Sequence, residues 1–214
     1  MRINTHYLAT LLAALFLFPP IAQSQTNQRF KAGIIVGLTA SQIDGDESAG
    51  YHKVGLQSGL KGIVILKPKQ QASVEILYSQ RGCRNEPKTY QQFNTTLNYI
   101  EIPLQWHYSD WLSEAADDAN DFYRVQFNIG LSWAYLLGYK DKYDEGYGIT
   151  AALPDLNKNS FCGMVGVSFY ATKNIGFTFR WQRAINNLYK PGNGGNYASS
   201  LNEHSLTFQT MFVF

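Results

Sequence analysis

Charged residues are scarce in this 214-residue chain, at 16% of the sequence, against about a quarter in an average soluble domain. Lys and Arg are scattered and the net charge is only +2, so no nucleic-acid partner is expected. No apolar run beyond the first 20 residues is long enough for a transmembrane helix. With only two cysteines, Cys83 and Cys162, a disulfide framework is also excluded.

The chain begins with the features of a secretory signal peptide. Arg2 precedes an apolar run at residues 8–18, and Pro19 ends that run. Ala22 and Ser24 are small residues in the positions that precede a cleavage site. We expect residues 1–24 to be a cleaved signal peptide and residues 25–214 to form one domain.

The rest of the chain alternates apolar and polar residues with the period of two that is typical of β-strands. The cleanest case is residues 122–137, where Phe127, Ile129 and Leu131 share one face and Asn128 and Ser132 the other. The pattern predicts eight strands, at residues 30–40, 52–67, 72–81, 97–108, 122–137, 161–170, 175–182 and 205–214. A low share of charge together with 14% aromatic residues suits strands that alternate in this way.

The connections between the predicted strands alternate in length. Long, polar segments occupy residues 41–51, 82–96, 138–160 and 183–204, whereas residues 68–71 and 171–174 are tight and residues 109–121 intermediate. Long loops at one end and short turns at the other are typical of transmembrane barrels. We therefore predict an all-β fold, an eight-stranded antiparallel transmembrane β-barrel with long extracellular loops and short periplasmic turns.

A barrel of eight strands has an interior just wide enough for side chains. The polar faces of the strands carry five charged residues that we expect to form a structural ion network in the lumen: Lys61, Glu75, Glu101, Arg124 and Arg180. Charges in a narrow interior must be paired. We therefore expect a plugged barrel that does not conduct ions freely. We also expect Cys83 and Cys162 to be free thiols, because they belong to the third and sixth strands, too far apart in the ring for a disulfide.

Aromatic residues on the apolar faces are expected to anchor the barrel at the two membrane interfaces. The predicted interface residues are Tyr78, Trp106, Tyr123, Tyr135 and Trp181. The last strand ends on Phe214, and a terminal aromatic of this kind is expected to act as the C-terminal signal for the barrel-assembly machinery. Outer-membrane lipid is the other expected partner.

Two segments resemble the PorT-like outer-membrane β-barrel family, a group with an outer membrane protein beta-barrel domain. Residues 73–82 (SVEILYSQRG) are similar to its third strand and residues 99–104 (YIEIPL) to its fourth. The start at residues 31–34 and the terminal Phe214 also fit. The resemblance implies a Gram-negative outer-membrane location and gives a hint of a role in protein secretion. It carries no catalytic motif.

The sequence favours a non-enzymatic structural or accessory role, with a secretion-machinery or periplasmic protein as partner. No catalytic, cofactor-binding or metal-binding residues are predicted. One alternative is an outer-membrane lipid-modifying hydrolase using His204, Ser205 and Glu203, although neighbouring residues on a strand face opposite sides. The other is a soluble periplasmic lipocalin-like binding barrel, which would turn its apolar faces inward.

Overall fold

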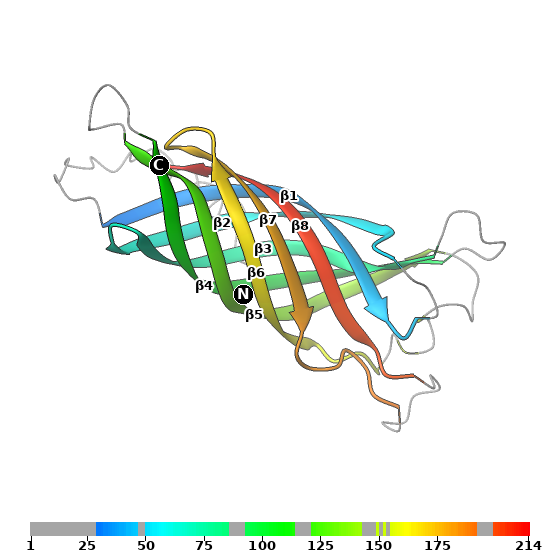
Figure 1. Cartoon of the computed structure of the whole chain (residues 1–214). Helices are drawn as coiled ribbons and strands as arrows, with labels where there is room; N and C mark the ends of the chain where they lie inside the picture. Colours follow the sequence, from blue (N-terminus) through cyan, green and yellow to red (C-terminus); the bar gives the residue numbers. More distant parts are fainter. Residues whose placement is uncertain are drawn as a thin grey trace, which may run out of the picture.

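Eight antiparallel strands close into a barrel in sequence order, with β8 pairing back onto β1 (Figure 1). The computed structural model describes residues 29–46, 50–85, 93–113, 121–142, 149, 152, 155–191 and 199–214. The strands are β1 (Phe30–Asp44), β2 (Lys53–Lys67), β3 (Gln70–Arg84), β4 (Asn94–Ser113), β5 (Phe122–Lys142), β6 (Asn159–Tyr170), β7 (Ile175–Ala184) and β8 (Asn202–Val213). The predicted fold is thus confirmed, while the predicted signal peptide lies outside the described residues.

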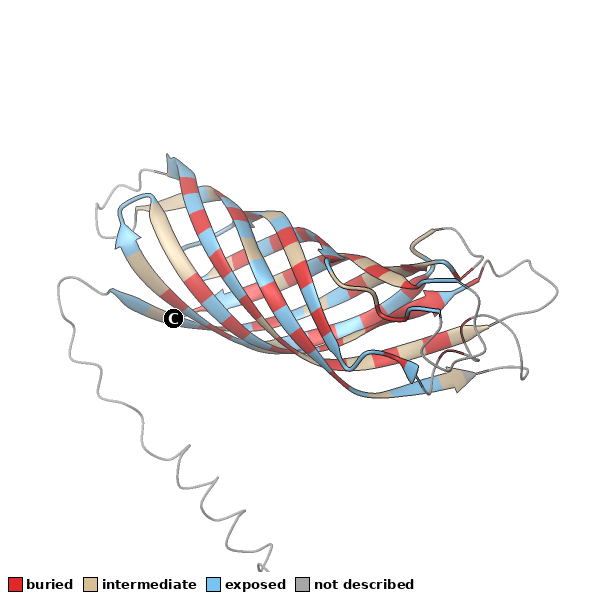
Figure 2. Cartoon of the chain, turned by 90° about the horizontal axis from the view of Figure 1, so that it is seen from below, coloured by how far each residue is buried: buried red, intermediate tan, exposed pale blue. Residues whose placement is uncertain are grey.

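Burial alternates residue by residue along every wall of the barrel, as the stripes in Figure 2 show. On β5, Ile129 and Leu131 face outward and are 56% and 62% exposed, whereas Gln126, Asn128 and Ser132 are buried in the lumen. The apolar faces therefore point away from the interior. This contradicts the lipocalin-like alternative, in which the apolar faces of the strands would turn inward.

Short and long connections lie at opposite ends of the barrel. The β2–β3 and β6–β7 connections are only residues 68–69 and 171–174, and they share an end with the C-terminus. We call this the short-turn end, and the opposite one the long-loop end. In outer-membrane barrels the short turns are periplasmic and the long loops extracellular.

Two backbone irregularities occur where β3 meets β4. Pro103 has no N–H to donate, and the recorded pairs run from Val74↔Leu104 to Leu77↔Glu101 without those between. The register is the same on both sides, so Pro103 leaves a gap in the ladder and not a bulge. At Gly82 the φ angle is +139° and an added Cβ would collide with the carbonyl oxygen of Thr95, so only glycine fits.

Within the described residues, no helix is long and apolar enough to cross a bilayer.

Candidate functional site

The middle of the lumen contains an ion cluster centred on Glu75, which we call the Glu75 cluster (Lys61, Glu75 and Arg180). Lys61 Nζ lies 3.1 Å from Glu75 Oε1 on the neighbouring strand. Arg180 donates to both carboxylate oxygens, at 3.0 and 3.1 Å, which is the strong two-pronged geometry of arginine with a carboxylate. Because Arg180 is on β7 and Glu75 on β3, four strands away in a ring of eight, this ion pair crosses the barrel.

A second cluster lies in the lumen on the long-loop side of Glu75, and we call it the Arg81 cluster (Arg81, Glu101 and Glu203). The Arg81 guanidinium pairs with Glu101 on β4 and lies 3.6 Å from the Glu203 carboxylate on β8. The guanidinium also stands over the Tyr99 ring, 5.3 Å from its centroid, which adds a cation–π contact. All three charged side chains are at most 2% exposed.

Together the two clusters balance their formal charges. Three cations (Lys61, Arg81 and Arg180) face three anions (Glu75, Glu101 and Glu203). Buried charges are tolerated only when they are paired in this way. The clusters span the lumen from wall to wall, so they obstruct it at two levels.

The structure brings four of the five predicted network residues into these clusters, but in two groups and not one. The fifth, Arg124, is exposed near the start of β5 and belongs to neither cluster, so this prediction was wrong. Arg124 is only two residues from the start of β5 at the short-turn end, where side chains are open to solvent. Sequence reasoning missed Arg81 and Glu203 as network members, although Arg81 shares the face of Glu75 on β3.

Apolar residues pack beside the charged clusters in the lumen. Next to the Glu75 cluster, Ile35, Ile63, Leu77, Met211 and Val213 pack with Tyr170. At the long-loop side, a larger cluster combines strand residues with residues from the connections. It contains Ile43, Cys83, Leu97, Tyr99, Ala134, Leu136, Ile149, Ala152, Leu156, Leu188, Tyr189 and Leu201. The long-loop end is therefore closed by an apolar core.

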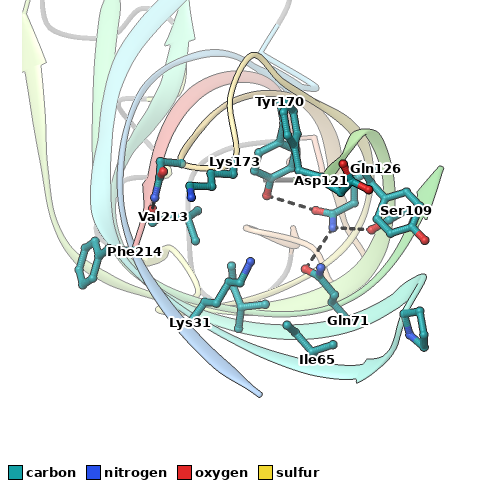
Figure 3. A pocket seen from close by; sticks show the side chains of 15 residues that line it. Lys31, Ile65, Gln71, Ser109, Asp121, Gln126, Tyr170, Lys173, Val213 and Phe214 are labelled. Carbon is teal, nitrogen blue, oxygen red and sulfur yellow. Dashed lines mark hydrogen bonds between the residues drawn. The ribbon is translucent and has the colours of Figure 1, made fainter. Parts of the chain in front are cut away.

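A cavity of about 500 Å³ opens at the short-turn end (Figure 3). Gln126 is one of the residues that line it, and its side-chain amide donates to Gln71 at 3.2 Å and to Ser109 at 3.1 Å. The hydroxyl of Tyr170 donates to the amide oxygen of Gln126 at 3.5 Å. Charged residues at the mouth are Lys31, Asp121 and Lys173. The cavity thus offers amide and hydroxyl groups above an apolar floor.

An exposed ion pair lies at the short-turn end of the barrel. Lys69, in the β2–β3 turn, donates to the Asp110 carboxylate at 3.3 Å. This hydrogen bond raises the pKa of Lys69 above its ordinary value. Both side chains are largely in solvent, so the pair contributes little to stability.

The residues of the hydrolase alternative do not converge. Glu203 and Ser205 are buried in the lumen, whereas His204 faces outward, where it contacts Asp44 at 2.9 Å and Tyr51 at 2.8 Å. A catalytic triad requires the three groups to meet at one point. The barrel wall separates them instead.

A serine and a histidine that sequence reasoning did not pair do meet in the lumen. Ser73 Oγ lies 2.7 Å from His107 Nε2, and both residues are buried. Nδ1 of His107 has no hydrogen-bond partner among the described residues, so no acid orients the ring as a triad would require. The pair therefore satisfies polar groups in the lumen without forming a nucleophilic site.

Four of the five predicted interface aromatics lie on the outer surface, whereas Tyr123 lines the cavity at the short-turn end. Tyr78, Trp106, Tyr135 and Trp181 are exposed, and Tyr123 is half-buried with Lys69 Nζ 5.9 Å from its ring centroid. Their anchoring at the two interfaces stays a prediction.

Phe214 completes the ring of strands. Its backbone exchanges two hydrogen bonds with Ala32 on β1, at 2.8 and 3.1 Å, while its side chain is 66% exposed. The C-terminus is therefore held by the first strand with its aromatic ring facing outward. Its role as an assembly signal stays a prediction.

Both cysteines are free and buried, as predicted. Cys83 joins the apolar core at the long-loop end, and Cys162 Sγ lies 3.8 Å from Arg81. Within the described residues, no group of three or more His, Cys, Asp or Glu side chains could hold a metal ion.

Comparison with known proteins gives matches among solved structures, whereas no curated protein matches. Neisserial surface protein A is 11% identical, with a TM-score of 0.43 over 87% of this chain and 98% of that chain. Ail of Yersinia pestis, in a phospholipid nanodisc, is 12% identical, with a TM-score of 0.44 over 86% and 99%. Outer membrane protein W of E. coli is 12% identical, with a TM-score of 0.35 over 86% and 98%.

A family model supplies the assignment. The model described as Outer membrane protein beta-barrel domain matches residues 21–190, most of the chain. This match agrees with the closed ring of eight strands and the outward apolar faces. The chain belongs to the outer membrane protein beta-barrel domain family, and it is a protein of the cell outer membrane.

Proposed function

We propose that this protein is a non-enzymatic, non-conducting accessory barrel whose periplasmic end binds a protein partner. The observation that carries the proposal is the filled lumen: the Glu75 and Arg81 clusters cross it at two levels, and an apolar core closes the long-loop end. A barrel filled in this way has no path for solutes. The short-turn end, in contrast, retains an open cavity.

The chemistry of this cavity suits a segment of polypeptide. Gln71, Ser109 and Gln126 present donors and acceptors of the kind that pair with backbone amides. Tyr170 and Val213 add apolar surface, as in most binding pockets. The resemblance to PorT-like barrels supports the narrower proposal that the partner belongs to protein secretion across the outer membrane.

Site-specific photo-crosslinking in native outer membranes tests the proposal. A photoreactive phenylalanine analogue replaces Phe122, which lines the cavity, and in a matched control replaces Leu60, which faces outward on β2. We expect a protein adduct from position 122 and lipid adducts alone from position 60. If position 122 gives no protein adduct, the periplasmic partner is refuted.

A further inference from the structure

An apolar groove crosses the outward face of β5, β6 and β7. Its volume is about 580 Å³, within the usual range of small-molecule pockets. It is lined by Ile129, Gly130, Leu131, Gly163, Met164, Val165, Trp181, Arg183, Ala184 and Ile185. The groove lies on the surface that faces lipid, separate from the lumen and from the cavity at the short-turn end.

Gly163 creates the groove. It occupies an outward position on β6 between Phe161 and Val165, and it pairs with Leu131 on one side and Arg183 on the other. A Cβ added at Gly163 would meet no atom within 4 Å. One side chain is therefore missing from an otherwise continuous apolar wall, and the neighbouring side chains form the sides of the gap.

Arg183 lies at the long-loop end of the groove. It follows Trp181 by two residues on β7, which runs from a short turn toward the long-loop end. Its side chain is 57% exposed and contacts Asp44 at 3.4 Å. Arginine has five N–H donors, so one contact with Asp44 leaves donors for another anion. Arg183 is also the only charged residue among those that line the groove.

We propose that this groove binds one acyl chain of a phosphorylated glycolipid of the outer leaflet, with Arg183 donating to the glycolipid phosphate. The apolar lining matches the chain, and the planar guanidinium matches a phosphate. The position of Arg183 toward the extracellular end selects the outer leaflet, where the phosphate-bearing lipid is a glycolipid. A chain in the groove fills the volume that Gly163 leaves open.

Native mass spectrometry of the detergent-solubilised full-length barrel with added diphosphorylated lipid A tests this site. We expect one bound lipid A per barrel. Arg183→Gln, which removes the cation, should lower the affinity about tenfold, the scale of one charge-assisted hydrogen bond. Gly163→Leu, which fills the groove, should also lower the bound fraction because it excludes the acyl chain. Phosphate-free lipid A should bind wild type and Arg183→Gln equally weakly.

Two control variants are matched to the test variants. Gly138→Leu adds the same side chain at another glycine with open space around it, and Arg124→Gln removes another exposed arginine. Both should bind lipid A as the wild type does. Three results would overturn the proposal. The first is that Gly163→Leu and Arg183→Gln bind lipid A as the wild type does, and the second is that phosphatidylglycerol binds the wild type as well as lipid A does. The third is that the barrel forms dimers that contain no lipid.

Discussion

Among the described residues, Glu75 is the anion that pairs with both Lys61 and Arg180 in the middle of the lumen. Its carboxylate is fully buried and contacts both cations at 3.0–3.1 Å. Removing one partner of a buried ion pair leaves an uncompensated charge, which costs far more than the pair itself contributes. The stability of the barrel should therefore respond strongly to this residue.

Glu75→Ala should lower the free energy of unfolding by about 3–5 kcal/mol, since two cations lose their counter-charge. Urea unfolding of the barrel in lipid vesicles, followed by tryptophan fluorescence, measures the change. Adding Lys61→Met to Glu75→Ala should recover part of the loss, because one unpaired cation is then gone. Arg124→Ala, at an exposed arginine, should stay within about 0.5 kcal/mol of wild type. A Glu75→Ala barrel as stable as wild type would refute the role of the Glu75 cluster.

Cys83 and Cys162 give a second prediction for single residues. They are on β3 and β6, and both thiols are free and about 1% exposed. A maleimide reagent should label neither thiol in the folded barrel, and both after unfolding without reductant. Mass spectrometry counts the labels. An unfolded chain that takes up no label would show a disulfide and contradict the structure.

At the scale of the strands, we test which face of β5 contacts lipid and which faces the lumen. Ile129→Arg should destabilise the barrel by about 2–4 kcal/mol, because it places a cation on the lipid face near mid-span. Leu137→Arg, closer to the long-loop end of the same strand, should cost about 0–1 kcal/mol. Unfolding in lipid vesicles compares the two variants. Equal costs, or a silent Ile129→Arg, would contradict the assigned lipid face.

The strands themselves were predictable, because alternation is a local property of the sequence. All eight were found, but their ends were not: β4 extends to Asn94–Ser113 and β5 to Phe122–Lys142, beyond the predicted residues 97–108 and 122–137. Here the backbones of β4 and β5 continue to pair beyond the residues in which apolar and polar side chains alternate. Backbone hydrogen bonds, which the side-chain pattern does not record, set these ends.

The lumen clusters were only partly predictable, since they depend on how the ring closes. The face of each charged residue follows from its strand, which placed Lys61, Glu75, Glu101 and Arg180 correctly inside. That Arg180 reaches Glu75 across the barrel, and that Arg81 meets Glu203, depends on the stagger between distant strands. The groove at Gly163 was not predictable for the same reason. A missing side chain on β6 becomes a groove only where β5 and β7 place larger side chains on both sides of it.

At the scale of the whole molecule, the barrel is closed at the long-loop end and open at the short-turn end. The apolar core around Leu97, Leu136 and Leu201 fills the first, and the cavity around Gln126 occupies the second. This asymmetry is the reason why we propose a partner at the periplasmic end. It also separates the protein from porins, whose wider barrels leave an aqueous channel.

The most direct test of the sealed lumen is planar-bilayer recording of the purified barrel. Among the described residues, the two charged clusters cross the lumen and an apolar core occupies its long-loop end, so we predict no stable conductance under an applied voltage. Steady, porin-like current steps from the folded wild-type protein would contradict the account.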